Sequence, residues 1–188
     1  MNFFYEAKIF SPEFCNSIIS EREANSSYED ISYWSEELPS DRIEFFNNLS
    51  ESVYPHIVSY FNIFKNLMDI SDVQLNGYTL VRQHPSHHDD LHYDTPIYNR
   101  YGVEKTRPFV CIVYLNDNFE GGECIFPAQD YVIKPEQGKL VIFPASYHFP
   151  HMVIGVFGND RYSIRLTYSQ RAPVFNLDLN KWDSAYDS

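Results

Sequence analysis

A histidine and an aspartate two positions apart, His92 and Asp94, have the residue types and the spacing to bind a metal ion together. They lie in the run Leu91-His92-Tyr93-Asp94, where apolar and polar residues alternate as in a half-buried strand. In an extended chain, residues i and i+2 point to the same face. Two imidazoles and one carboxylate that leave open positions are the ligand set typical of non-heme Fe(II). The third ligand must come from elsewhere in the chain, and His151 is the candidate.

The same His-x-Asp spacing occurs twice more, at His87-x-Asp89 and at His88-x-Asp90. These four residues belong to an unbroken polar run that follows a proline, which indicates a solvated turn. The alternating run downstream is therefore the better metal-binding candidate. Together with His84, the upstream residues form an alternative accessory metal site.

The length and the charge of the chain restrict its organisation and its partners. At 188 residues the chain is long enough for one well-buried domain and short for two, so we expect a single domain over 1–188. Its helical part is expected at about 11–68 and its β core at about 73–170. The net charge of −12 and the pI near 4.9 argue against nucleic acid or an anionic membrane as partner, because both would be repelled. The oligomeric state stays open.

The three cysteines predict neither a disulfide framework nor a zinc site, because their number is odd and no two are closely spaced. We expect Cys15, Cys111 and Cys124 to be small buried hydrophobic residues. The first residues lack a basic stretch of the kind that opens a signal peptide, and no apolar run approaches the length of a membrane span. These features predict a soluble protein of the cytoplasm.

The first third of the chain has helical periodicity. Ser11 as an N-cap, followed by Pro12, predicts a helix that continues to about Glu23. From residue 40 to about residue 68, apolar residues recur at spacings of three and four. Pro55 interrupts that pattern, which predicts a kink or two separate helices. A polar segment separates the two helical stretches, and we expect the helices to brace a sheet.

From residue 73 the periodicity becomes that of strands, separated by turn signals such as Gly121-Gly122 and Gly138. Seven or eight short strands of this kind are typical of a sandwich or barrel, so the expected fold is mainly β with bracing N-terminal helices. We predict strands at about 3–9, 73–81, 91–94, 109–115, 123–127, 140–143 and 161–168.

The segment 96–108 has no clear periodicity and is predicted to be an irregular excursion close to the His92 strand. Loops beside a rigid site commonly carry binding residues. The stretch from Tyr98 to Arg107, with Tyr98, Arg100 and Tyr101, is therefore a candidate lid.

An ordered set of motifs resembles the 2-oxoglutarate and Fe(II)-dependent dioxygenases, and most of all their prolyl 4-hydroxylase-like branch. The resemblance covers roughly residues 75–168 and implies a double-stranded β-helix (jelly-roll) core. In that core a His-x-Asp pair and a distal histidine hold iron, and a basic residue further along anchors the cosubstrate. The motifs are His92-x-Asp94, Gly121-Gly122-Glu123, Phe126-Pro127, Gly138, Phe143-Pro144, His151 and Arg161-Tyr162-Ser163.

On this resemblance, His92, Asp94 and His151 match the three iron ligands. His148 competes with His151 for the distal position. His151 is favoured because it stands ten positions before Arg161, whereas His148 stands 13 positions before it. The alternative for His148 is a residue that faces solvent or lies behind the metal ligands.

The resemblance also implies residues for the cosubstrate. Arg161 can bind the far carboxylate of 2-oxoglutarate through its planar fork, and Arg165, on the same strand face, is the rival anchor. Tyr114 matches a tyrosine whose hydroxyl supports that carboxylate, although a core aromatic is the alternative. Ser163 is a further hydroxyl on that face. The tyrosine that related enzymes carry upstream of the His-x-Asp pair is missing here, and Tyr78 is its possible substitute.

The activity implied by the resemblance is that of a hydroxylase, a 2-oxoglutarate-dependent dioxygenase. It couples oxidative decarboxylation of 2-oxoglutarate to hydroxylation of a C–H bond, with peptidyl proline as the expected substrate. The cofactor is Fe(II), the cosubstrates are 2-oxoglutarate and O2, and ascorbate is admitted as a reductant. The alternatives are an oxygenase acting on another residue or a small molecule, a non-catalytic jelly-roll binding module, and a cupin-like metalloenzyme that uses no 2-oxo acid.

Overall fold

The computed structural model describes residues 3–62, 73–95, 97–100 and 103–170. The chain begins with strand β1 (Tyr5–Lys8) and helix α1 (Pro12–Glu23). The side chain of Ser11 accepts a hydrogen bond from the backbone N–H of Phe14, which caps this helix as predicted. Within the described residues, no helix is long and apolar enough to cross a lipid bilayer.

The second helix, α2 (Ile43–Phe61), continues through Pro55 without dividing into two. Proline removes one backbone donor from the helix, but here it lies on the exposed face, where water can bond the carbonyl that loses its partner. The opposite face is held by buried residues such as Val53 and Ile57. The predicted continuation beyond residue 62 lies outside the described residues.

The polar segment between the helices contains a strand, β2 (Ile31–Trp34), that the sequence pattern did not reveal. Two short 3-10 turns, Ser35–Glu37 and Ser40–Arg42, lead from this strand into α2. The strand forms because it pairs with a long neighbour, β3 (Val73–Gln83), in the large sheet.

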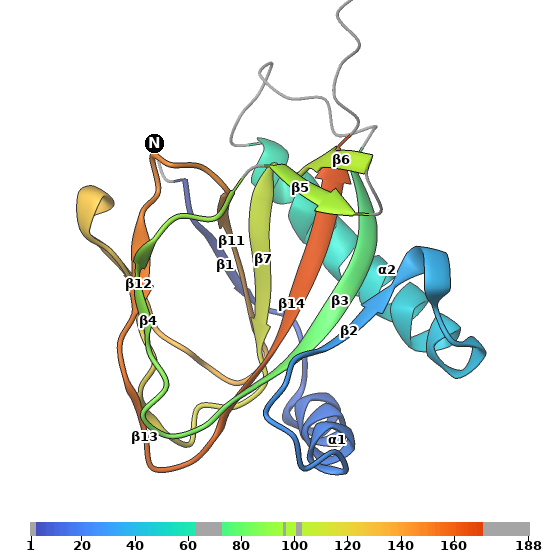
Figure 1. Cartoon of the computed structure of the whole chain (residues 1–188), viewed down its shortest axis with the longest axis horizontal. Helices are drawn as coiled ribbons and strands as arrows, with labels where there is room; N and C mark the ends of the chain where they lie inside the picture. The colour runs from blue at the N-terminus through green and yellow to red at the C-terminus, as the bar shows by residue number, and fades with distance from the viewer. Residues whose placement is uncertain (1–2, 63–72, 96, 101–102, 171–188) are drawn as a thin grey trace, which may run out of the picture.

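Two antiparallel sheets face each other and form the double-stranded β-helix that the resemblance implied (Figure 1). The larger sheet has the order β1-β11-β7-β14-β3-β2, and the hairpin β5-β6 joins it where β6 pairs with β14. The smaller sheet has the order β10-β9-β12-β4. The remaining pair is β8 with β13. The bounds are β4 (Asp89–His92), β5 (Ile97–Arg100), β6 (Val103–Thr106), β7 (Phe109–Tyr114), β8 (Glu120–Gly121), β9 (Cys124–Phe126), β10 (Tyr131–Ile133), β11 (Lys139–Pro144), β12 (His151–Val153), β13 (Val156–Phe157) and β14 (Arg161–Gln170), with a 3-10 turn at Pro127–Gln129.

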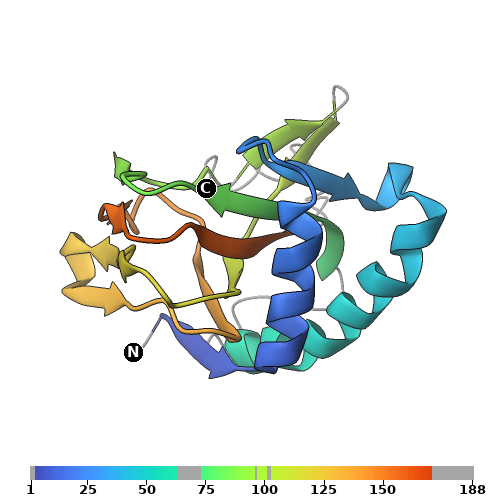
Figure 2. The same ribbon diagram turned by 90° about the horizontal axis from the view of Figure 1, so that it is seen from below.

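Buried residues form two clusters, one on each face of the larger sheet. Helices α1 and α2 pack on its outer face, where residues such as Leu49, Ile57 and Leu166 are buried (Figure 2). The second cluster lies between the two sheets and includes Phe126 and Phe143. The helices therefore brace the sheet as predicted, and the space between the sheets is left for a site. All three cysteines are free and buried, as expected.

Two local predictions are wrong. The described part of 96–108 is a hairpin, β5 with β6, rather than an irregular excursion. Asp89 and Asp90 begin strand β4 rather than ending a solvated turn. In both cases pairing with a neighbouring strand supplies the hydrogen bonds, so that polar residues without apolar alternation still become extended.

Candidate active site

Three side chains predicted as metal ligands converge between the sheets. Each of His92, Asp94 and His151 offers one ligand atom, and these three atoms lie within 4.8 Å of one another. No other group of three or more His, Cys, Asp or Glu residues in the described part of the chain converges in this way. His92 and His151 are directly paired in the register of β4 with β12, and their ring centroids are 4.5 Å apart. Asp94 lies two residues beyond the end of β4, and its Oδ2 is 3.4 Å from Nε2 of His151.

Both imidazoles are oriented by backbone carbonyls. Nδ1 of His92 donates to the carbonyl of Asp90 at 2.7 Å, and Nδ1 of His151 donates to the carbonyl of Phe149 at 3.1 Å. In the neutral form of each imidazole, Nε2 is then the nitrogen with a free electron pair, which can bind a metal. Burial lowers the pKa of His151, which favours its neutral form further.

The competing histidines lie outside this group. His148 is exposed, and its ring contacts Ser146 rather than His92 or Asp94. His87 is 3.2 Å from Asp89, but the upstream polar run gathers no third ligand atom among the described residues. The geometry therefore favours His151 for the distal position and gives no support to the accessory site.

A small cavity of about 100 Å³ opens beside the three ligands, between the two sheets. The alternation of β14 turns Arg161, Ser163 and Arg165 toward this cavity. Apolar residues of neighbouring strands in the same sheet, such as Val110 of β7 and Phe143 of β11, also line the cavity. The cavity thus combines a metal-ligating group, a row of polar side chains and a water-excluding wall.

Arg161 is the buried cation that lines this cavity. It is only 5% exposed, its Nη1 donates to Oε1 of Gln83, and its guanidinium carbon lies 5.1 Å from the centroid of the Tyr114 ring. Its Nε has no hydrogen-bond partner among the described residues. A buried guanidinium N–H without a partner is costly and rare. This unsatisfied donor fits the carboxylate of a dicarboxylic acid.

The neighbours of Arg161 differ in how well they suit the same anion. Tyr114 is 1% exposed, and burial raises the pKa of its hydroxyl to about 12, so that it stays a hydrogen-bond donor at neutral pH. Ser163 is buried on the same face. Arg165 is about half exposed and pairs with Asp30 at 2.8 Å, as a surface arginine does.

Tyr78 does not reach the cavity, so the suggestion that it replaces the missing upstream tyrosine is wrong. It lies on the opposite face of β3 and stacks on Tyr33, with 4.9 Å between ring centroids, in the core under the helices. Side chains alternate between the two faces of β3, so Tyr78 points away from the face that carries Thr79 and Val81.

Two residues beside the ligands were not singled out from the sequence. Gln83, at the end of β3, contacts Arg161, and Arg107 donates from Nη2 to Oδ1 of Asp94 at 3.0 Å. No motif or spacing in the sequence indicates either role. Arg107 stands 13 residues after its partner and Gln83 stands 78 residues before Arg161, so only the folding of the sheets brings each pair together.

Gly122 leaves room for the side chain of Arg161. Its φ is +73°, and a Cβ at this position would lie 3.3 Å from Cδ of Arg161 and 2.8 Å from the ring of Phe119. Glycine therefore provides both the left-handed backbone and the space that the arginine occupies. Of the two residues predicted to form a turn, Gly121 instead ends strand β8, and Gly122 lies between β8 and β9.

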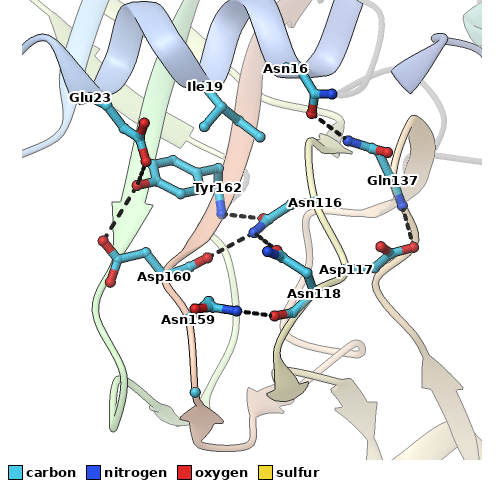
Figure 3. Close-up of a pocket in the computed structure, with 11 residues that line it drawn as sticks. Asn16, Ile19, Glu23, Asn116, Asp117, Asn118, Gln137, Asn159, Asp160 and Tyr162 are labelled. Atoms are coloured by element: carbon cyan, nitrogen blue, oxygen red, sulfur yellow. Dashed lines mark hydrogen bonds between the residues drawn. The ribbon is translucent and has the colours of Figure 1, made fainter. Parts of the chain in front are cut away.

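A larger pocket lies elsewhere, between α1 and the loops that precede β8 and β14 (Figure 3). It measures about 610 Å³ and is lined by amides and carboxylates. Its deeply buried side chain, Asn116, is already satisfied, because it bonds Asn118, the carbonyl of Asp160 and the backbone N–H of Tyr162. We read this network as a structural link between the loops and the strand that carries Arg161.

Residues 73–168 match the 2OG-Fe(II) oxygenase superfamily. Because this match covers half of the chain and includes the converging ligands and Arg161, the chain belongs to that superfamily. The resemblance seen in the sequence is confirmed, and the family implies Fe(II) and 2-oxoglutarate as cofactor and cosubstrate.

Curated relatives and solved structures are consistent with this assignment. The chain is 28% identical over 149 residues to prolyl 3-hydroxylase 2 of Rattus norvegicus, covering 70% of this chain and 21% of the relative, and 33% identical over 95 residues to the Homo sapiens protein of that name, covering 46% and 13%. It thus spans about a fifth or less of the length of these relatives.

Similar folds occur in a viral collagen prolyl hydroxylase from Paramecium Bursaria Chlorella virus-1 and in a Pseudomonas putida prolyl-4-hydroxylase. The viral structure, a 2OG complex, gives a TM-score of 0.68 at 16% identity and covers 91% of this chain and 97% of its own. The bacterial structure gives 0.65 at 18%, with coverages of 92% and 95%. At these identities the likeness concerns the fold.

Proposed function

We propose that this chain is an Fe(II) and 2-oxoglutarate-dependent hydroxylase in which His92, Asp94 and His151 hold the iron and Arg161 binds 2-oxoglutarate. The observation that carries the proposal is the convergence of those three ligand atoms within 4.8 Å, beside a buried arginine whose Nε has no partner in the described structure. Two neutral imidazole nitrogens and a carboxylate are the donor set suited to non-heme Fe(II). The residues present therefore fit the cofactor of the family.

When bound, the iron and its cosubstrates supply the oxidising chemistry that breaks a C–H bond. The chain's own residues bind, orient and exclude water. Arg161 would pair with the far carboxylate of 2-oxoglutarate, and the protonated hydroxyl of Tyr114 would be a second donor to it. Apolar side chains such as Val110 and Phe143 keep the inner wall of the cavity dry.

We further propose that the substrate is a peptidyl proline. The names of the relatives support this class, and so does a second cavity of about 410 Å³ that adjoins the first. The two cavities share Val81, Gln83, Asp89 and Arg165. Tyr28 and His84 meet edge to face along the outer cavity, with 5.5 Å between ring centroids, and offer an aromatic surface to a pyrrolidine ring.

The experiment that tests the activity combines binding with turnover. Under anaerobic conditions the wild-type protein with Fe(II) and 2-oxoglutarate should develop a metal-to-ligand charge-transfer band, and His92→Ala should lack it. With O2 and a library of proline-containing peptides, succinate should accumulate and one oxygen atom should be added to a proline. Fragmentation of the product distinguishes C3 from C4 hydroxylation.

Each negative outcome has a defined meaning. A wild-type protein without the charge-transfer band would contradict the iron and 2-oxoglutarate site. A band without succinate from any peptide or small molecule would support a binding module that does not turn over. Oxidation of a substrate without consumption of 2-oxoglutarate would instead support a metalloenzyme that uses no 2-oxo acid.

A further inference from the structure

The two oxygens of the Asp94 carboxylate face different partners. Oδ2 lies 3.4 Å from Nε2 of His151, within the group that converges on a metal position. Oδ1 accepts a hydrogen bond from Nη2 of Arg107 at 3.0 Å. One oxygen is thus directed toward the metal position, and the other is already used by a cation.

The guanidinium of Arg107 is itself fixed at a second point. Its Nε and Nη2 donate to the backbone carbonyl of Thr95 at 3.2 and 3.0 Å. The planar fork therefore spans the carboxylate and the carbonyl of the next residue, which restrains both the position and the tilt of the carboxylate. Lysine, with one ammonium on a flexible chain, cannot reproduce this arrangement.

The contact also joins the two sheets beside the three converging side chains. Arg107 lies between β6 and β7 of the larger sheet, whereas Asp94 follows β4 of the smaller sheet. Both side chains are mostly shielded, with exposures of 20% and 23%. A charge-assisted hydrogen bond in such a position is screened less than one on the open surface.

We propose that Arg107 is a positioning residue that reserves Oδ1 of Asp94, so that the carboxylate offers a single oxygen to the metal. This inference rests on the proposed function. A carboxylate free to bind through both oxygens would occupy one more coordination position, whereas three single-atom ligands leave the open positions that the family's cosubstrates need. Mutation of a residue that hydrogen-bonds to a metal ligand typically costs about 10–100-fold in metal affinity or activity.

The test measures metal binding by the apo-protein without any turnover. Isothermal titration with Ni(II) should show about 10–100-fold weaker binding for Arg107→Gln than for the wild type, and Arg107→Lys should restore little of the loss. The matched control is Arg42→Gln, because Arg42 also forms a largely shielded ion pair, with Glu21, but far from the site. Its metal affinity should equal that of the wild type.

A double variant separates positioning from a general effect on folding. In an Asp94→Ala background, which leaves two histidines to bind Ni(II), Arg107→Gln should cause no further loss. An equal loss in both backgrounds would show a structural role and overturn the proposal. Unchanged affinity in the single Arg107→Gln variant, or full rescue by lysine, would also overturn it.

The proposed function fails in a different way. If the wild type binds no metal, or if His92→Ala binds Ni(II) as well as the wild type does, the metal site itself is wrong and the role of Arg107 falls with it. If the wild type binds and His92→Ala does not, while Arg107→Gln matches the wild type, only the role of Arg107 is refuted.

Discussion

Replacing Arg161 by glutamine removes the buried cation that we propose as the anchor of 2-oxoglutarate. Arg161 is 5% exposed and has an Nε donor without a partner in the described structure, so an anion at this point meets a charge that water screens little. A hydrogen bond to a charged group contributes about 1.5–3 kcal/mol. This corresponds to a rise of about 10- to 150-fold in the dissociation constant of 2-oxoglutarate.

The assay is an anaerobic titration of the Fe(II)-loaded protein with 2-oxoglutarate, followed by the charge-transfer band. The matched control is Arg165→Gln, since Arg165 lines the same cavity but is 48% exposed and already paired with Asp30. Exposed ion pairs contribute only about 0–1 kcal/mol, so the control should change the dissociation constant by less than about fivefold. An effect of Arg165→Gln that equals or exceeds that of Arg161→Gln would refute the assignment of the anchor.

Further predictions concern the glycine beside the anchor, the buried tyrosine and the metal itself. An alanine in the left-handed region costs about 1–2 kcal/mol, and Gly122→Ala should lower the free energy of unfolding by more than that. Gly158→Ala should lower it by only that amount in chemical unfolding, because Gly158 has a φ of +86° and a Cβ there would meet nothing within 4 Å. Tyr114→Phe should weaken 2-oxoglutarate binding by about 2- to 13-fold. The loss should be equal at pH 7 and pH 9, because the pKa of about 12 keeps the Tyr114 hydroxyl protonated at both. A loss confined to one pH would contradict this role. Ni(II) at 100 times its dissociation constant should stabilise the wild type by about 2.7 kcal/mol, and this gain should vanish in His151→Ala but persist in His148→Ala.

The sequence by itself was sufficient to predict the three side chains that converge and to propose Arg161 as the anchor, because these signals are local or follow a fixed order along the chain. His92 and Asp94 are two residues apart, and the ten-residue interval between His151 and Arg161 singled out this pair of residues. The cap at Ser11 was equally local, since a side-chain oxygen bonds an N–H three residues away. Such features depend on the backbone geometry of a few neighbouring residues.

Only the tertiary structure decided which side chains surround those residues. Strand β2 and the hairpin β5-β6 exist because neighbouring strands supply their hydrogen bonds, and their own sequences carry little alternation. Tyr78 was excluded from the cavity by the register of β3 with β14. Arg107 reaches Asp94, and Gln83 reaches Arg161, only after the sheets have closed on each other. Contacts between distant residues depend on strand register and sheet packing, which no short stretch of sequence encodes.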